Sequence, residues 1–200
     1  MIGILDYGLG NIYSVSNAFE YLNCRYKIVN SAQDISKMDS IVIPGVGNFK
    51  HGVESLERQE ILSEINDFAL IQKKPVLGIC LGMQLMASKS EEGGVSKGLG
   101  WFDFNVKEIK VPGGHLKTPV VGWIEVEASD SLLLNNISRP TFYFVHSFYV
   151  SGNSKHVTST YDSGVCIAAS VERDNIFGVQ FHPEKSQQDG LRVLDNFSKM

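Results

Sequence analysis

The sequence has only three cysteines among 200 residues, Cys24, Cys80 and Cys166, and no two of them form a CxxC pair. An odd number of widely spaced cysteines suits neither a disulfide framework nor a zinc site, so reduced thiols in a cytoplasmic protein are expected. We expect no metal and no other cofactor.

Long apolar runs and an excess of positive charge are also missing. No uninterrupted apolar stretch reaches the roughly 18 residues of a membrane span. Segment 1–6 has no basic residues before its apolar run and ends in the acidic residue Asp6, so no signal peptide is expected. The formal net charge is -4, whereas a nucleic-acid binder usually carries a basic stripe. The composition therefore predicts no membrane and no nucleic-acid partner.

Apolar runs alternate with helical patterns in the first half of the chain. Strands are expected at 1–5, 26–29, 39–43 and 75–79, and helical stretches at 11–22, 52–56 and 60–71. Alternation of strand and helix is typical of an α/β protein with a parallel sheet.

The second half of the chain has a different pattern of expected elements. After an expected surface loop at 88–100, short β-rich runs follow one another without helices, at 105–111, 120–127, 141–150, 157–161, 165–171 and 176–181. Such runs predict antiparallel strands added to the edge of the parallel sheet. A closing helix is expected at 187–197. No repeat or linker interrupts the chain, so one domain over residues 1–200 is expected.

A candidate nucleophile follows the apolar run 75–79, in the sequence Gly78-Ile79-Cys80-Leu81-Gly82. Glycines on both sides of the cysteine allow a sharp strand-to-helix turn, which pushes the middle residue toward strained φ and ψ. The sulfur would then lie near a helix N-terminus, where partial positive charge favours a thiolate. A small buried cysteine at a strand end is the alternative.

Two glycine-bearing loops follow other expected strands. Segment 6–11 (Asp-Tyr-Gly-Leu-Gly-Asn) lacks the third glycine of a dinucleotide fingerprint, so a turn capped by Asn11 or Ser14 is favoured over a nucleotide site. In segment 44–47 (Pro-Gly-Val-Gly), glycines flank Val46, and their flexibility allows backbone amides to point at a ligand. As an isolated string, that segment is more often a plain turn.

A base for Cys80 is expected at His182. A cysteine nucleophile needs a base, and the base needs an orienting partner. Among five histidines, His182 alone ends an expected strand with a carboxylate two residues later, and residues i and i+2 of an extended chain point the same way. Glu184 therefore completes a candidate triad. His146 has no carboxylate near it in sequence and is expected to be structural or to line the pocket.

Three segments carry a family resemblance. Segments 44–47, 78–84 and 178–187 resemble, in this order, the three signatures of class I (triad) glutamine amidotransferases. Segments 6–11, 143–147 and 190–197 narrow the resemblance to the glutaminase subunits of imidazole glycerol phosphate synthase, which belongs to histidine biosynthesis. The resemblance spans essentially the whole chain. It implies a flavodoxin-like α/β fold, with helices on both faces of a parallel central sheet and added antiparallel edge strands.

The resemblance also implies a reaction. Cys80 would attack the side-chain amide of L-glutamine, and His182 would take the thiol proton and return it to departing ammonia. Glu184 would orient His182 while water hydrolyses the thioester to glutamate.

Substrate contacts follow from the same resemblance. The oxyanion would meet the Leu81 amide and an amide near Val46 and Gly47. Gln84 and Glu92 match positions that bind the two ends of glutamine. Without the resemblance, a solvent-facing helix residue and a solvated loop charge would be the ordinary interpretations.

The implied partner is a synthase (cyclase) subunit, which forms a heterodimer with the glutaminase and uses its ammonia to make imidazole glycerol phosphate and AICAR. In the family, the positions that face the synthase correspond to Asn11, Trp123, Tyr143 and Lys185. Their alternatives are a turn cap, core or surface aromatics, and a solvated lysine.

Two departures leave the ammonia acceptor open. Ile124 stands where the family usually has Asn, and segment 101–104 (Trp-Phe-Asp-Phe) replaces a Pro-Gly turn. The same glutaminase chemistry feeding another synthase, such as a sugar-modifying amidotransferase, is therefore an alternative. A cysteine peptidase or chaperone-like protein is disfavoured because Leu81, not histidine, follows Cys80. An inert scaffold is disfavoured because every triad residue is present.

Overall fold

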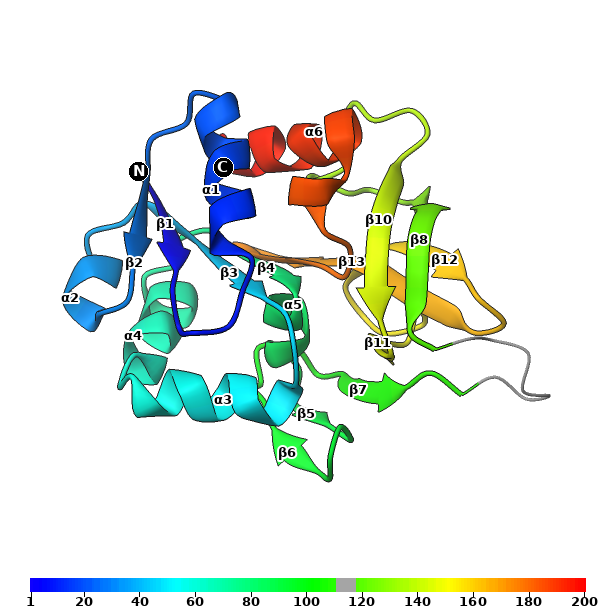
Figure 1. Ribbon diagram of the computed structural model, residues 1–200, viewed down its shortest axis with the longest axis horizontal. Helices are drawn as coiled ribbons and strands as arrows, with labels where there is room; N and C mark the ends of the chain where they lie inside the picture. Colours follow the sequence, from blue (N-terminus) through cyan, green and yellow to red (C-terminus); the bar gives the residue numbers. More distant parts are fainter. Residues whose placement is uncertain (111–117) are drawn as a thin grey trace.

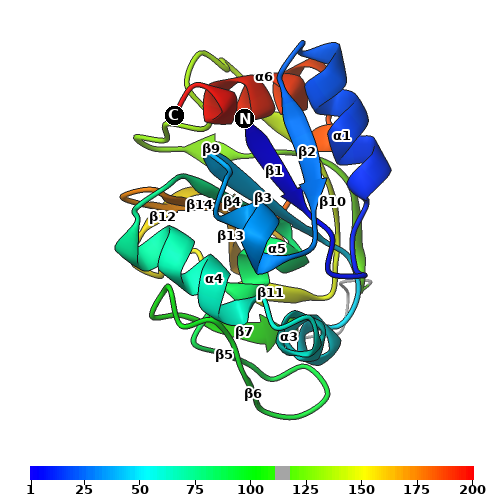
Figure 2. The same ribbon diagram turned by 90° about the vertical axis from the view of Figure 1, so that its left-hand side faces the viewer.

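A computed structural model describes residues 1–110 and 118–200 and shows a central eight-stranded sheet (Figures 1 and 2). Its strand order is β2-β1-β3-β4-β14-β13-β12-β9. The strands from β2 to β14 are parallel: β2 (Tyr26–Val29), β1 (Ile2–Leu5), β3 (Ser40–Gly45), β4 (Val76–Cys80) and β14 (Ile176–Val179). The remaining three are antiparallel: β13 (Cys166–Arg173), β12 (Val157–Asp162) and β9 (Glu127–Ala128). The predicted α/β class with antiparallel strands at one edge is confirmed.

Helices cover both faces of this sheet, as Figure 1 shows. On one face lie α1 (Ile12–Tyr21) and α6 (Gln187–Ser198); on the other lie α3 (Phe49–Arg58), α4 (Leu62–Asn66) with the π-helical turn η1 (Asp67–Ile71), and α5 (Leu81–Leu85). A short α2 (Ala32–Ile35) follows β2. No helix within the described ranges is long and apolar enough to cross a membrane.

Each face of the sheet has its own hydrophobic core because successive side chains of a strand point to opposite sides. In β3, Ile41 and Ile43 pack into the core under α3 and α4, whereas Val42 packs into the core under α1 and α6. The strand is buried at all six positions. A continuous apolar run was therefore the right signal for a strand covered on both faces.

Three of the six β-rich runs, 105–111, 120–127 and 141–150, lie largely outside the central sheet. β8 (Val120–Glu125) and β10 (Thr141–His146) pair only with each other, and β11 (Phe148–Val150) joins β7 (Asn105–Glu108), β5 (Lys89–Ser90) and β6 (Ser96–Lys97) in a separate sheet. The expected loop at 88–100 thus contains a β5–β6 hairpin, and the expected strand 141–150 is divided at Ser147. Periodicity predicts strands but not their partners, which is why these placements were wrong. Residue 111, the end of the run 105–111, lies outside the described residues.

Three glycines allow β3, β4 and α5 to approach one another closely. A Cβ atom added to Gly82 would lie 1.8 Å from the carbonyl oxygen of Ile43. At Gly78 it would lie 2.6 Å from the backbone of Gly82, and at Gly45 it would lie 2.8 Å from Cβ of Leu81. Packing at the end of two adjacent strands therefore requires glycine at positions 45, 78 and 82.

We expect Gly82→Ala to lower the free energy of unfolding by about 3 kcal/mol or more, because the new methyl group meets rigid backbone. Gly52→Ala is the matched control. Its Cβ would meet the flexible Leu85 side chain at 3.0 Å, and alanine favours the helix, so a change within about 1 kcal/mol is expected. Urea unfolding followed by circular dichroism measures both values. Equal effects of the two substitutions would contradict this account of the glycines.

Candidate active site

Cys80 is the last residue of β4 and directly precedes α5. Its backbone has φ 54 and ψ -106, a conformation that costs a residue with a side chain about 1–3 kcal/mol. The predicted strained strand-to-helix turn is confirmed. The residue is 7% exposed and lines a pocket of about 310 Å³ at the carboxyl ends of the parallel strands. Pockets at this edge are where open α/β sheets bind their ligands.

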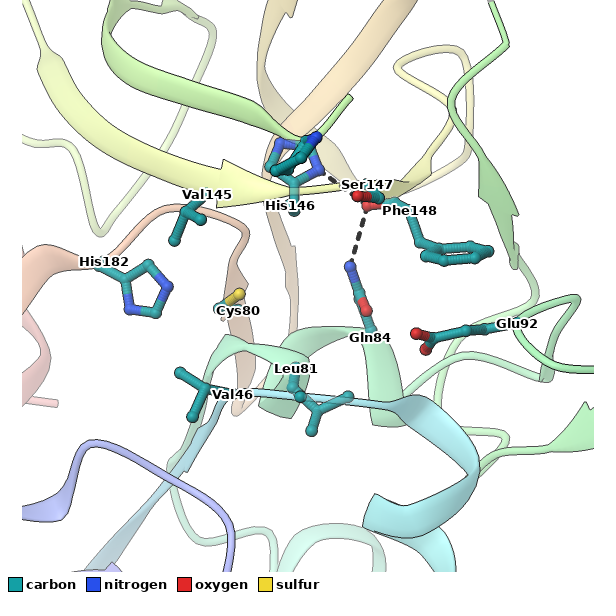
Figure 3. Close-up of a pocket in the computed structure, with 12 residues that line it drawn as sticks. Val46, Cys80, Leu81, Gln84, Glu92, Val145, His146, Ser147, Phe148 and His182 are labelled. Atoms are coloured by element: carbon teal, nitrogen blue, oxygen red, sulfur yellow. Dashed lines mark hydrogen bonds between the residues drawn. The ribbon is translucent and has the colours of Figure 1, made fainter. Parts of the chain in front are cut away.

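His182 and Glu184 form a buried hydrogen-bonded pair beside Cys80. The distance between Nδ1 of His182 and Oε1 of Glu184 is 2.8 Å, and each side chain is 1% exposed. The predicted contact is confirmed, but the extended geometry expected for it is not, because residues Pro183–Lys185 form a 3-10 turn, η2. The carboxylate can only accept, so Nδ1 donates, and Nε2 is left for Cys80. Figure 3 shows the imidazole and the sulfur side by side in the pocket.

The charges around His182 favour an imidazolium. Burial opposes a charged ring, but the Cys80 thiolate and the Glu184 carboxylate together outweigh it and raise the pKa of His182 to about 10. No described residue makes a hydrogen bond of ordinary geometry with Nε2. A thiolate beside an imidazolium can attack an electrophilic carbon and then supply a proton to the leaving group.

Segment 44–47 lies next to the sulfur because Gly45 is paired with Cys80 in the β3–β4 register. Val46 and Gly47 line the pocket together with Leu81. Gly47 has φ 111, a left-handed conformation that favours glycine. The loop thus ends a strand beside Cys80 and forms part of the pocket wall.

Gln84 and Glu92 line the same pocket. Gln84 is 5% exposed, so it is not the solvent-facing helix residue of the alternative interpretation. Its Nε2 donates to the carbonyl oxygen of Phe148 at 3.0 Å (Figure 3). Oε2 of Glu92 accepts from the backbone amide of Phe49 at 2.7 Å, so Glu92 is also held rather than loosely solvated.

His146 lines the pocket without being able to act as its base. Its Nδ1 donates to the carbonyl oxygen of Phe148 at 2.8 Å, and the Tyr161 hydroxyl donates to its Nε2 at 2.7 Å. Burial lowers the pKa of His146 to about 4, so the ring is neutral at physiological pH. The expectation that it is structural or lines the pocket agrees with this geometry.

Three members of the site were not predicted from the sequence. Gln180 is fully buried, and its Nε2 donates to Sγ of Cys80 at 3.6 Å. Its spacing from His182, two residues along the chain, is the signal that could have identified it. The Phe148 carbonyl and the Tyr161 hydroxyl have no comparable signal, since their roles depend on strands that meet only in the folded chain.

The four positions matched to a partner-facing surface are close together in the fold. Trp123 is 48% exposed, and its ring lies 6.0 Å from that of Tyr143, its neighbour across the β8–β10 pair. Nζ of Lys185 lies 5.9 Å from the centre of the Tyr143 ring. Nδ2 of Asn11 donates to Oε1 of Glu184 at 3.4 Å, so Asn11 reaches the triad itself. We call Trp123, Tyr143 and Lys185 the aromatic cluster.

Metal ligation has no support in the part of the chain that the structure describes. Within residues 1–110 and 118–200, no group of three or more His, Cys, Asp or Glu side chains is arranged to hold an ion.

Comparison with known proteins agrees with this geometry. The family model described as "Glutamine amidotransferase class-I" matches residues 3–200. A Campylobacter jejuni subsp. jejuni protein named imidazole glycerol phosphate synthase subunit HisH 1 is 41% identical over 202 residues, covering 100% of both chains. A Leptospira interrogans subunit HisH is 42% identical, also with 100% coverage of both. A Bacillus subtilis subunit HisH is 38% identical and covers 100% of this chain and 96% of its own.

Solved structures support the fold. One described as a crystal structure of glutamine amidotransferase has a TM-score of 0.78 at 14% identity and covers 99% of this chain and 97% of its own. The glutaminase domain of Trypanosoma brucei CTPS, with bound acivicin, has a TM-score of 0.66 at 18% identity, covering 99% and 93%. From the family match and from relatives about 40% identical over their whole length, we conclude that this chain belongs to the class-I glutamine amidotransferase family.

Proposed function

We propose that this chain, acting as one domain over residues 1–200, is the glutaminase subunit of an imidazole glycerol phosphate synthase. It hydrolyses L-glutamine and supplies the ammonia to a synthase subunit in a cytoplasmic heterodimer of histidine biosynthesis. The observation that carries the proposal is the strained Cys80 beside the 2.8 Å His182–Glu184 pair, in a chain whose full-length relatives are named as subunits of that enzyme.

The first half of the reaction forms a thioester. The Cys80 thiolate attacks the side-chain carbonyl carbon of glutamine, and the C=O π electrons move to oxygen. His182, charged because of its raised pKa, gives its Nε2 proton to the nitrogen as the C–N bond breaks and ammonia leaves. Glu184 keeps Nδ1 protonated and the ring turned toward Cys80.

The second half restores the enzyme. Neutral His182 takes a proton from water as the water oxygen attacks the thioester carbon, and glutamate leaves as the C–S bond breaks. In both halves the amide of Leu81 and an amide of the 46–47 segment stabilise the oxyanion. One donor of this kind is worth about 10²–10³ in rate, so the position of the loop can control the reaction.

Gln84 and Glu92 suit the recognition of glutamine's amino-acid end. Figure 3 shows the two on the far side of Cys80 from His182, which leaves the scissile amide at the triad when the charged end lies beside them. The carboxylate of Glu92 attracts an α-ammonium group. The NH₂ of Gln84 is occupied by Phe148 and Gln180, so its Oε1 is the atom left to accept a hydrogen bond from the same ammonium group.

The aromatic cluster suits a docking surface for the synthase. It projects a 48% exposed tryptophan, edge-on to a tyrosine, next to the segment that carries His182 and Glu184. Aromatic anchors of this kind dominate many interfaces. Docking here would place the acceptor site close to the point where ammonia is released, before water can protonate it.

The two sequence departures have packing explanations. Trp101 is 1% exposed, and its Nε1 donates to Oδ1 of Asn66 at 2.7 Å, so it belongs to the core. Ile124 is half-buried and packs against the core under α1 and α6. Neither observation favours a different ammonia acceptor, so the histidine-pathway synthase is retained as the proposed partner.

Cys80→Ala should reduce glutamine hydrolysis at least about 10³-fold, because the nucleophile is lost. The chain should stay folded, because the backbone contacts that hold the turn remain. Cys24→Ser and Cys166→Ser should retain near wild-type rates. Glutamate release by the chain in complex with its synthase measures all three. Wild-type activity in Cys80→Ala, or labelling of another cysteine by a glutamine-analogue electrophile, would show that the nucleophile is misassigned.

The raised pKa of His182 predicts the alkaline limb of the pH profile. The imidazolium is kept below its pKa and lost above it, so kcat/KM should fall only near pH 10 rather than near pH 6.5. Glu184→Gln removes one cause of the raised pKa and should move this limb down by about one unit or more. Glu127→Gln, on the exposed strand β9, should leave it in place. An unchanged limb in Glu184→Gln would contradict the assigned pair.

The isolated chain should hydrolyse glutamine slowly, and the synthase with its acceptor substrate should raise the rate about 10²–10³-fold if docking completes the oxyanion site. Trp123→Ala should weaken both binding and activation, whereas Tyr21→Ala, a 68% exposed aromatic at the far end of α1, should not. Glutamate release with and without synthase and acceptor provides the measurement. Full activity of the isolated chain, unchanged by any synthase, would identify an uncoupled glutaminase instead.

A further inference from the structure

Gln180 approaches the nucleophile from the same segment as His182. It follows β14, and its backbone amide donates to the carbonyl oxygen of Ala169 at 2.9 Å, which fixes the segment against β13. The side chain is 0% exposed, and its Nε2 lies 3.6 Å from Sγ of Cys80. Cys80 therefore has two nitrogen-bearing neighbours two residues apart, one that can exchange a proton and one that cannot.

The direction of the Gln180 amide is determined by a chain of hydrogen bonds. The Phe148 carbonyl can only accept, so the group of Gln84 that lies 3.0 Å from it must be the NH₂. The same Nε2 is 2.9 Å from Gln180, so the atom it meets there must be the accepting Oε1. The NH₂ of Gln180 is then left to face the sulfur. Reversing either amide would place two donors or two acceptors together.

We propose that Gln180 is a further residue of the catalytic site, which holds the Cys80 thiolate through its side-chain NH₂ and is itself oriented by Gln84. This proposal rests on the proposed function. The Gln84–Gln180 hydrogen bond connects a side chain that binds glutamine to the sulfur atom that attacks it. Gln84 can meet the substrate with its Oε1, which Figure 3 shows turned away from Phe148, while its NH₂ keeps Gln180 in place.

The Gln180 amide differs from the ionisable groups around the sulfur because its charge state does not change. The ionisable groups that face Cys80 are His182, with Glu184 behind it, and Tyr7, while His146 is neutral. His182 gives up its proton when ammonia leaves, so its stabilisation of the sulfur changes during the cycle. The Gln180 amide keeps its protons throughout. It stabilises the thiolate before attack and again when the C–S bond breaks and the sulfur regains its electron pair.

The decisive variant is Gln180→Met, which has similar length and shape but no donor. In a Cys24→Ser/Cys166→Ser background, Cys80 alkylation by iodoacetamide is followed from pH 5 to pH 10. A hydrogen bond to a charged group predicts a rate at low pH roughly 10- to 100-fold below that of the parent. The pH of half-maximal rate should rise by about one to two units, and the high-pH plateau should be equal or higher, because a less stabilised thiolate is more nucleophilic.

Gln72→Met, at an exposed position remote from the pocket, is the matched control and should leave the profile unchanged. A purely structural role for Gln180 would lower the alkylation rate at every pH or leave the profile unmoved, and either result would overturn the proposal. If Gln180→Met does not fold, the side-chain ¹⁵N–¹H₂ signals of Gln180 in the otherwise unaltered chain provide the test. They should shift as Cys80 titrates and on its alkylation; insensitivity to both would also overturn the proposal.

The alkylation assay needs neither glutamine nor a synthase, so its failure counts against Gln180 alone. With glutamine and the synthase present, Gln180→Met should lower kcat more than it raises KM, roughly 10-fold or more in kcat. A shifted alkylation profile with no glutaminase activity in the parent complex would instead support the thiolate contact and refute the proposed function.

Discussion

The left-handed backbone of Cys80 is the constraint on which the rest of the site depends. Cys80 has a Cβ atom, so φ 54 is unfavourable there and persists only because its surroundings hold it. The β3–β4 register holds one side, and the contact of Gly82 with the Ile43 carbonyl holds the other. The cost is about 1–3 kcal/mol. This conformation leaves Cys80 at the end of β4, where it lines the pocket.

The parallel sheet explains why segments far apart in sequence form one site. Parallel strands end at the same edge, so the residues that follow β3, β4 and β14 emerge side by side (Figure 1). Segment 44–47, the Cys80 turn and the His182–Glu184 turn are those residues. The antiparallel β8–β10 pair then adds Trp123 and Tyr143 next to them, since the backbone amide of His182 donates to the carbonyl of Tyr143 at 2.9 Å.

The site is also a buried polar network, which is stable only when its members are paired. The Phe148 carbonyl accepts from both His146 and Gln84, and Gln84 in turn pairs with Gln180. Within the described residues, Nε2 of His182 is one of the few buried side-chain atoms without a partner. An unpartnered nitrogen beside a sulfur is costly in a purely structural role, whereas a proton carrier needs that atom available. Nε2 of His182 is the atom at which the proposed proton transfer takes place.

The sequence by itself determined the elements whose signals are local. Apolar runs with intervening helical patterns identified the parallel strands, glycines around Cys80 identified the strained turn, and His182 with Glu184 identified a hydrogen-bonded pair. Most of the proposed site followed from these spacings and from the resemblance they carried. The α/β class needed only the order of strands and helices.

Only the tertiary structure decided what depends on pairing between distant segments. It divided the expected strand 141–150 at Ser147 and gave its two halves to different sheets. It also brought Phe148 to the pocket, and Tyr161 and Gln180 into contact with residues that line it. The bond of His182 to Glu184 forms across a 3-10 turn. A strand's periodicity specifies which side chains share a face, but its partner is set by the total packing and hydrogen bonding of the folded chain, which no local pattern contains.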